Sequence, residues 1–152
     1  MSVDSESYFI KCDNCGAKNR VPALRMKDMP VCGRCRNALS TTAAYPGHFV
    51  HIGDQAFGSE VLPFPGPVVV YVWAPWCGHC RRLTPVLEQM VRDYAGQIKF
   101  ARMILDQNPL TVSQYGIQAV PTLLLYKGGR LVDRIGGALP RTDLDRAFQR
   151  LV

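Results

Sequence analysis

All six cysteines of this 152-residue chain fall into Cys-x-x-Cys pairs, and this arrangement restricts the fold more than any other feature of the sequence. The pairs are Cys12/Cys15, Cys32/Cys35 and Cys77/Cys80. The first two lie in an N-terminal segment that is too short to bury a core of its own, whereas the third lies in a segment of about a hundred residues. We therefore expect a small module held by cysteines, followed by one ordinary domain.

The boundary between these parts is predicted from composition. Residues 36–48 are mostly small and polar, and a Pro46-Gly47 turn stands near their end, which is typical of a linker. We place the N-terminal module in residues 1–40, the linker in 41–48 and the second domain in 49–152.

The second domain alternates between strand and helix patterns, as a layered α/β fold requires. Residues 68–73 are a β-branched and aromatic run that predicts a strand buried on both faces, and residues 98–105 predict a second strand. Apolar residues then recur at helical spacing from Leu83 to Tyr94, which predicts a long amphipathic helix between these strands. Residues 49–66 are expected to form an edge strand and a helix.

The C-terminal third continues the same alternation. Asn108 is expected to cap a short helix that starts at Pro109, and residues 122–126 and 130–135 predict antiparallel strands joined across two glycines. Thr142 and Asp145 resemble a capping box at the start of a last helix.

The pair Cys77/Cys80 stands directly after the buried strand and at the start of the long helix. Unpaired N–H groups at a helix N-terminus favour a thiolate at Cys77, and Cys80 lies one turn further along the same face. Cys80 can therefore attack a mixed disulfide formed at Cys77, which predicts thiol–disulfide exchange. The alternative is that these two cysteines are buried thiols or half of a second metal site.

The string Trp76-Cys77-Gly78-His79-Cys80 resembles the active site of the thioredoxin family, and the resemblance extends over residues 49–152. It also includes Pro85 and the segments at 106–109, 115–117, 120–122 and 136–139. The resemblance implies a thioredoxin fold, in which a central mixed β-sheet is flanked by helices. In that family a cis-proline at the position of Pro121 lies against the disulfide, and the backbone at Val120 pairs with the substrate. Trp76, Gly78, Val120 and Gly137 are then expected to rim the docking surface.

Two residues depart from the usual pattern of the family's reductases. His79 replaces a proline, and an imidazole there is expected to stabilise the Cys77 thiolate and make the disulfide more oxidising. An oxidase or isomerase is therefore an alternative to a reductase.

Tyr71 replaces a buried carboxylate that is thought to help deprotonate the resolving cysteine, and tyrosine is a poor base at neutral pH. Tyr71 is either only a packing residue, or its presence means that water or His79 accepts the proton of Cys80 instead.

The N-terminal pairs have the spacing of a zinc site with four cysteine ligands, Cys12, Cys15, Cys32 and Cys35. We expect one structural zinc ion, because a segment of this size folds poorly without metal and a closed shell leaves no catalytic water. Two disulfides are the alternative. His48 and His51 are expected to be surface residues. The zinc ribbon followed by a thioredoxin domain resembles the thioredoxin-2 subgroup of bacterial thioredoxins.

The function predicted from these features is the reduction of protein disulfides, with recycling by a thioredoxin reductase. No G-x-G-x-x-G motif follows a strand, so no bound nucleotide cofactor is expected. The formal charge of +6 is divided evenly between residues 1–45 and 46–152, which argues against a nucleic-acid partner. The sequence predicts neither a membrane span nor a secretory signal, and we expect a cytoplasmic protein.

Two further hypotheses stay open at this point. In one, the zinc ribbon docks a protein or nucleic acid and the thioredoxin domain serves as its scaffold. In the other, oxidants eject zinc from the four thiolates and thereby regulate the enzyme.

Overall fold

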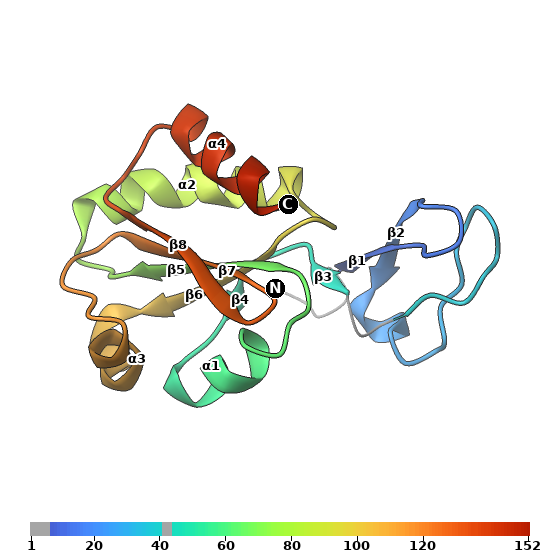
Figure 1. Ribbon diagram of the computed structural model, residues 1–152, viewed down its shortest axis with the longest axis horizontal. Coiled ribbons are helices and arrows are strands. Elements are labelled where there is room, and N and C mark those ends of the chain that lie inside the picture. Colours follow the sequence, from blue (N-terminus) through green and yellow to red (C-terminus); the bar gives the residue numbers. More distant parts are fainter. Residues whose placement is uncertain (1–6, 41–43) are drawn as a thin grey trace.

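The computed structural model describes residues 7–40 and 44–152, which form a large α/β domain with a small cysteine module beside it (Figure 1). The strands are β1 (Ser7–Lys11), β2 (Lys18–Pro22), β3 (Tyr45–Pro46), β4 (Val50–His51), β5 (Pro67–Trp73), β6 (Lys99–Ile104), β7 (Thr122–Lys127) and β8 (Arg130–Gly136). The helices are η2 (Ala23–Arg25), α1 (Asp54–Glu60), α2 (Gly78–Asp93), η3 (Leu105–Gln107), α3 (Pro109–Gln114) and α4 (Arg141–Leu151).

The large domain is built on a mixed sheet with the strand order β4-β6-β5-β7-β8. β4, β6 and β5 run parallel, β7 is antiparallel to β5, and β8 is antiparallel to β7. Gly128 and Gly129 connect β7 to β8 with φ angles of 60° and 80°, which other residues rarely adopt. The predicted fold class and the predicted hairpin are confirmed.

Helices cover both faces of this sheet. α2 and α4 lie on one face, and α1 and α3 lie on the other (Figure 1). Alternate side chains of β5 point to opposite faces of the sheet. Val69 and Tyr71 pack in the core under α2 and α4. The core on the other face contains Val68, Val70 and Val72. The continuous apolar run of β5 is thus explained, because the strand has no solvent-facing side.

Helices α1 and α3 cap each other through their side chains. The Asp54 backbone N–H at the start of α1 donates to Asn108 Oδ1 over 2.8 Å. The Asp54 carboxylate in turn accepts from the backbone N–H groups of Leu110 (3.0 Å) and Thr111 (2.9 Å) in the first turn of α3. Asn108 therefore precedes α3 as predicted, but its side chain caps α1 instead of α3.

The predicted capping box of the last helix is wrong. α4 begins at Arg141, directly after Pro140, and within the described residues no side chain caps this helix end. Asp145 instead accepts hydrogen bonds from the Tyr94 hydroxyl (2.8 Å) and from Arg141 Nε (3.3 Å). The bond from Tyr94 joins α4 to the C-terminal end of α2, whereas the bond from Arg141 lies within α4. A local sequence pattern does not reveal the contact between the two helices.

The cysteine module has a small antiparallel sheet in which β1 pairs with both β2 and β3. β3 belongs to the segment predicted as a linker, residues 41–48, of which 41–43 lie outside the described residues. The buried side chains of the module are Ile10, Cys12, Val21, Cys32, Leu39 and Ala44. The predicted linker thus contributes a strand to the module.

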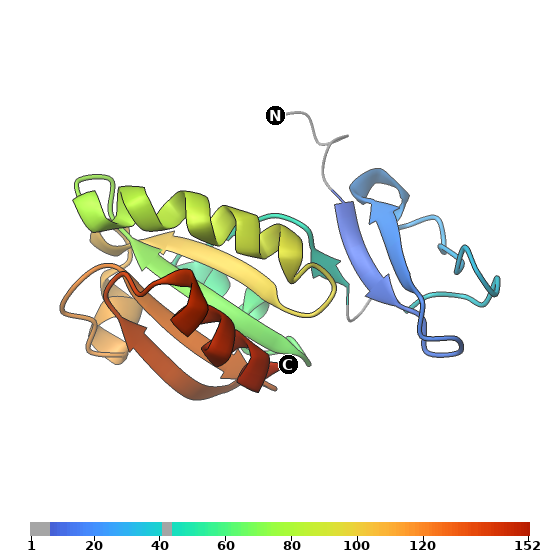
Figure 2. The ribbon, with the colours of Figure 1, turned by 90° about the horizontal axis from the view of Figure 1, so that it is seen from above.

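The module contacts the large domain at the end of α2 that is distant from Cys77 and Cys80 (Figure 2). The Lys18 ammonium group donates to the carbonyl of Ala95 over 2.9 Å, and the ring of Tyr45 packs edge-on against Phe64 at 5.1 Å between centroids. Gly96 has a φ of 87° and lies under Lys18, where a Cβ atom would come within 2.8 Å of the lysine side chain.

Among the helices that the structure describes, none has the length and apolar character needed to cross a bilayer.

Candidate redox and metal sites

The pair Cys77/Cys80 lies where β5 ends and α2 begins. Cys77 has an extended backbone and is the N-cap residue of α2, and Cys80 is in the first turn. The Cys80 backbone N–H donates to Cys77 Sγ over 3.2 Å, so the sulfur occupies the place that a capping oxygen would take. Cys77 is 6% exposed and Cys80 is fully buried. An incoming disulfide can therefore reach Cys77 and not Cys80.

The loop before β7 brings the predicted docking residues next to this sulfur. The Val120–Pro121 peptide bond is cis, and Cys77 Sγ lies 3.7 Å from the carbonyl oxygen of Val120. The Gly137 N–H donates to the Pro121 carbonyl over 2.9 Å, which places Gly137 beside the same loop. The structure thus brings Cys77, Val120, Pro121 and Gly137 together.

Trp76 and Gly78 flank the redox pair on the solvent side. The Trp76 side chain is 62% exposed, and its indole N–H donates to Asp106 Oδ2 over 2.6 Å. A Cβ atom at Gly78 would meet no atom within 4 Å in the described residues, so the surface beside Cys77 is open there. Asp106 was missed as a site residue, although it begins one of the segments that carry the family resemblance.

His79 contacts a charged neighbour, Arg82, in addition to lying near the start of α2. His79 is exposed, and its Nδ1 atom lies 3.1 Å from the Arg82 guanidinium one turn further along α2. A guanidinium group only donates, so the ring accepts this hydrogen bond through a lone pair at Nδ1. Arg81 is also bound to the loop, because its Nε and its NH2 group donate to the Pro75 carbonyl at 3.3 and 3.1 Å. No motif in the sequence distinguishes either arginine as a site residue.

Burial governs the protonation of Cys80. It raises the pKa of this thiol to about 11, and the neighbouring Cys77 sulfur acts in the same direction. The Tyr71 hydroxyl lowers the pKa of Cys80 but does not outweigh burial. Burial also raises the pKa of Tyr71 itself, so that its hydroxyl is a hydrogen-bond partner and not a base at neutral pH.

Tyr71 is held under α2 by its hydroxyl. The oxygen lies 3.2 Å from the Cys80 carbonyl, to which it donates, and 3.1 Å from Thr84 Oγ1. The Thr84 hydroxyl also donates to the Cys80 carbonyl, at 2.8 Å. Tyr71 thus fills the core and at the same time contacts the backbone of the resolving cysteine.

The four N-terminal cysteines converge as a metal site requires. The sulfurs of Cys12, Cys15, Cys32 and Cys35 all lie within 4.8 Å of one another. The sulfurs of Cys12 and Cys35 are 3.5 Å apart, and those of Cys15 and Cys32 are 3.6 Å apart. These separations exclude S–S bonds, which measure about 2.05 Å. They fit a tetrahedron, because Zn–S bonds of about 2.3 Å place the sulfurs roughly 3.8 Å apart.

N–H groups around Cys32 favour its ionised form, which is the form that binds metal. Backbone hydrogen bonds from Cys35 and Arg34 lower the pKa of Cys32 to about 6, and the Asn19 side chain contributes in the same direction. The Arg34 N–H lies 3.4 Å from the sulfur, and Asn19 Nδ2 lies 3.5 Å from it. Asn19 Oδ1 also accepts from the Gly33 N–H and so fixes the second turn. His48 and His51 are not members of this cluster.

Comparison with known proteins agrees with this geometry. The thioredoxin family profile matches residues 48–150, and a profile described as the N-terminal part of thioredoxin 2 matches residues 11–37. Thioredoxin 1 of Nostoc sp. is 43% identical over 99 residues, which are 65% of this chain and 92% of that protein. Thioredoxin 2 of Chlorobaculum tepidum is 43% identical over 95 residues, which are 62% of this chain and 87% of the relative. Thioredoxin of Haemophilus influenzae is 42% identical over 95 residues, 62% of this chain and 89% of its own length.

Proposed function

Because this chain belongs to the thioredoxin family, we propose that it reduces protein disulfides by dithiol–disulfide exchange through Cys77 and Cys80. The observation that carries the proposal is the position of the Cys77 sulfur. It caps α2, accepts the Cys80 N–H and lies at the edge of the protein surface, whereas Cys80 is fully buried behind it. One sulfur can therefore meet the substrate, and the other can act only after the first bond has formed.

The reaction has two exchange steps. The Cys77 thiolate attacks one sulfur of the substrate disulfide, a Cys77–substrate bond forms, and the other substrate sulfur leaves as a thiolate. Cys80 then loses its proton and attacks Cys77 Sγ, which releases the second substrate thiolate and leaves a Cys77–Cys80 disulfide. The substrate gains two electrons and the enzyme loses two. A thioredoxin reductase is the proposed partner that returns the enzyme to its dithiol form.

The substrate chain is proposed to dock on the loop before β7. The Val120 carbonyl is adjacent to the Cys77 sulfur, and pairing with an extended substrate would hold a disulfide against it. Pro121 shapes this loop, and Trp76, Gly78 and Gly137 form the rim. Trp76 supplies an exposed ring that Asp106 orients.

A reductase is proposed over an oxidase or isomerase because the matching profile and the similar relatives are those of thioredoxins, whereas His79 is the residue that supports the alternative. An imidazolium beside Cys77 would stabilise the thiolate and make the disulfide more oxidising. The reduction potential tests this choice: a value well below that of the glutathione pool supports a reductase, and a value at or above it supports the alternative.

The four N-terminal cysteines are proposed to bind one structural zinc ion. When bound, the ion supplies cross-linking of the two turns that carry Cys12/Cys15 and Cys32/Cys35, and it takes no part in the exchange. Four thiolates complete its coordination, so the module's own residues leave no open position. We propose the cytoplasm as the compartment, since four clustered thiols need a reducing environment to remain metal ligands.

Insulin reduction driven by NADPH and thioredoxin reductase tests the function. The wild-type chain is expected to reduce insulin, and Cys77→Ser is expected to abolish the activity. Cys12→Ser is the control, because it removes a cysteine of the module and leaves the redox pair intact. Full activity of the Cys77→Ser chain would refute the assignment and favour a binding module in which the thioredoxin domain is only a scaffold.

A further inference from the structure

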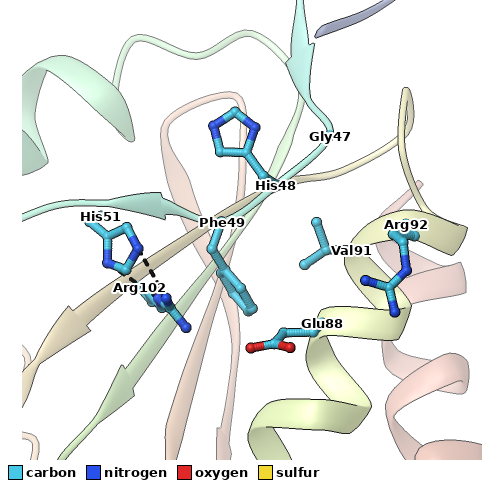
Figure 3. Close-up of a pocket in the computed structure, with 8 residues that line it drawn as sticks. All are labelled: Gly47, His48, Phe49, His51, Glu88, Val91, Arg92 and Arg102. Carbon is cyan, nitrogen blue, oxygen red and sulfur yellow. Dashed lines mark hydrogen bonds between the residues drawn. The ribbon is translucent and has the colours of Figure 1, made fainter. Parts of the chain in front are cut away.

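A hollow beside the edge of the sheet collects charged side chains that the redox reaction does not use. It measures about 340 Å³ and lies between the segment that leads into β4, strand β6 and residues 88–92 of α2 (Figure 3). The residues that line it are Gly47, His48, Phe49, His51, Glu88, Val91, Arg92 and Arg102.

Neither of its two guanidinium groups forms an ion pair in the described residues, although the Glu88 carboxylate lines the same hollow. In residues 7–40 and 44–152, no carboxylate oxygen lies within 4.0 Å of a nitrogen of Arg92 or Arg102. The Arg92 side chain donates to the uncharged Gln89 amide at 2.8 Å. With two arginines and one glutamate, Glu88, the hollow carries a net positive charge even when both histidines are neutral.

Arg102 is held in place before any ligand arrives. Its guanidinium carbon lies 5.1 Å from the ring centre of Phe49 and 5.8 Å from that of Trp73. Its Nε donates to His51 Nδ1 at 3.3 Å, and its NH2 group lies 3.0 Å from His51 Nε2. Burial, together with the charge of Arg102, lowers the pKa of His51, so the ring stays neutral and accepts from the arginine. A side chain fixed in this way loses little conformational freedom when it binds an anion.

The two walls of the hollow face each other across Phe49. Figure 3 shows His51 and Arg102 side by side on the strand side, and Glu88, Val91 and Arg92 on the helix side. A group bound above Phe49 would lie between these two walls, one carrying Arg102 and the other Arg92. Planar guanidinium groups bind the oxygens of phosphate and carboxylate groups, often through two parallel hydrogen bonds.

A metal ion is a poorer fit for this hollow. The only group of three or more histidine, cysteine or acidic side chains with converging ligand atoms in the described part of the chain is the set of four N-terminal cysteines. His48, His51 and Glu88 therefore do not form a cation site, and the two arginines would repel a cation.

From these contacts we propose that the hollow formed by Phe49, His51, Glu88, Arg92 and Arg102 binds a phosphoryl oxyanion, either free phosphate or the phosphate group of a small phosphomonoester. The two arginines supply the donors, and Phe49 with Val91 forms the apolar floor. Glu88 weakens the binding by repulsion, so that the affinity is modest and depends on its charge. The site is independent of the exchange at Cys77.

Calorimetric titration of the full-length, zinc-loaded chain with inorganic phosphate, at constant ionic strength, tests the proposal. Saturable binding is expected, with Arg102→Gln weakening it about tenfold or more because a charge-assisted hydrogen bond is lost. Glu88→Gln is expected to tighten binding, and Arg130→Gln is the control because this exposed arginine lies in the hairpin, outside the hollow. Trp73 fluorescence gives a second readout, since its ring contacts Arg102.

The relative affinities distinguish a phosphomonoester site, a free-phosphate site and adventitious binding. Tighter binding of phosphoserine than of inorganic phosphate points to a phosphomonoester, and the reverse order points to the free ion. Both support the site provided that Glu88→Gln tightens binding. Equal affinity in all variants would show adventitious binding of the ion to surface charge and would overturn the proposal, as would the absence of saturable binding. Glu88→Gln keeps the test decisive if Arg102→Gln does not fold, because Glu88 makes no ion pair in the described structure.

Discussion

The ammonium group of Lys18 in the cysteine module donates to the backbone carbonyl of Ala95, just past the C-terminal end of α2. Carbonyl groups at a helix C-terminus carry partial negative charge, so a lysine there is favourable. α2 has 16 residues, and a helix of that length spans about 24 Å. The module therefore contacts the thioredoxin domain about one helix length from Cys77 and does not cover the redox site.

Replacement of Lys18 is expected to loosen this contact. Lys18→Met removes the charge-assisted bond to Ala95 and the contact of the ammonium group with the Phe9 ring at 5.1 Å, while most of the aliphatic chain over Gly96 remains. We expect a loss of about 1 kcal/mol, or a fall of about 2–4 °C in the unfolding midpoint, with unchanged insulin reduction. Lys11→Met, at an exposed lysine of β1, is the control. An equal fall in both variants would contradict a specific role for Lys18.

Removal of zinc is expected to unfold the cysteine module and to leave exchange at Cys77 intact. The module buries few side chains besides the cysteines, so its fold depends on the metal. A chelator should abolish the dispersed NMR amide signals of residues 7–40, and added zinc should restore them. Insulin reduction should persist throughout. An ordered module in a sample shown to contain no metal would contradict this account.

Substitution of Tyr71 tests whether this position only packs in the core or also affects the deprotonation of Cys80. Tyr71→Asp would bring a carboxylate to the buried region beside Cys80, and we expect it to speed release of a mixed disulfide near pH 7. Because a large buried ring is lost and a charge is buried, stability should fall by about 3 kcal/mol or more. Tyr71→Asn is the matched control without the charge. Equal release rates in the two variants would show that the position has only a packing role.

The pKa of Cys80 determines how the release of substrate from the mixed disulfide depends on pH. Its pKa is raised to about 11, so near neutral pH only a small fraction of this thiol is ionised. The rate at which Cys80 resolves a mixed disulfide should therefore rise about tenfold per pH unit between about pH 7 and 9. Stopped-flow measurement of substrate release from a preformed mixed disulfide checks this. A rate that is flat over this range would mean that another step or another base controls release.

The same shift in pKa has a consequence for stability. Between the ordinary value of 9.0 and about 11, folded chains keep a proton on Cys80 that unfolded chains release. The folded state then binds more protons, so this contribution to stability is complete below about pH 9 and is lost as the pH rises toward 11.

Features that depend on residues close together in the sequence could be predicted. The buried strand β5, the helix α2 and the Gly128-Gly129 hairpin follow from side-chain periodicity and from backbone angles that glycine adopts easily. The four-cysteine cluster was also predicted, because two turns of fixed spacing can present their sulfurs to one ion. These contacts are set by short segments of chain.

Contacts between distant segments could not be predicted in this way. Lys18 and Ala95 are 77 positions apart, and Trp76 and Asp106 are 30 apart. Asp145 was expected to serve the start of its own helix but binds Tyr94, 51 positions away, because α4 packs on α2. Arg82 was overlooked beside His79, since the spacing of two exposed residues on a helix does not reveal which of them interact.

The central claim is that Cys77 attacks the substrate and Cys80 completes the exchange, and trapping of the intermediate tests it most directly. The Cys80→Ser chain is incubated with a disulfide-containing protein, and the covalent product is identified by mass spectrometry after proteolysis. We predict a stable substrate adduct on Cys77, with no comparable adduct in the Cys77→Ser chain. An adduct that forms on Cys80 in the Cys77→Ser chain at the same rate, or the absence of any adduct on Cys77, would contradict the account.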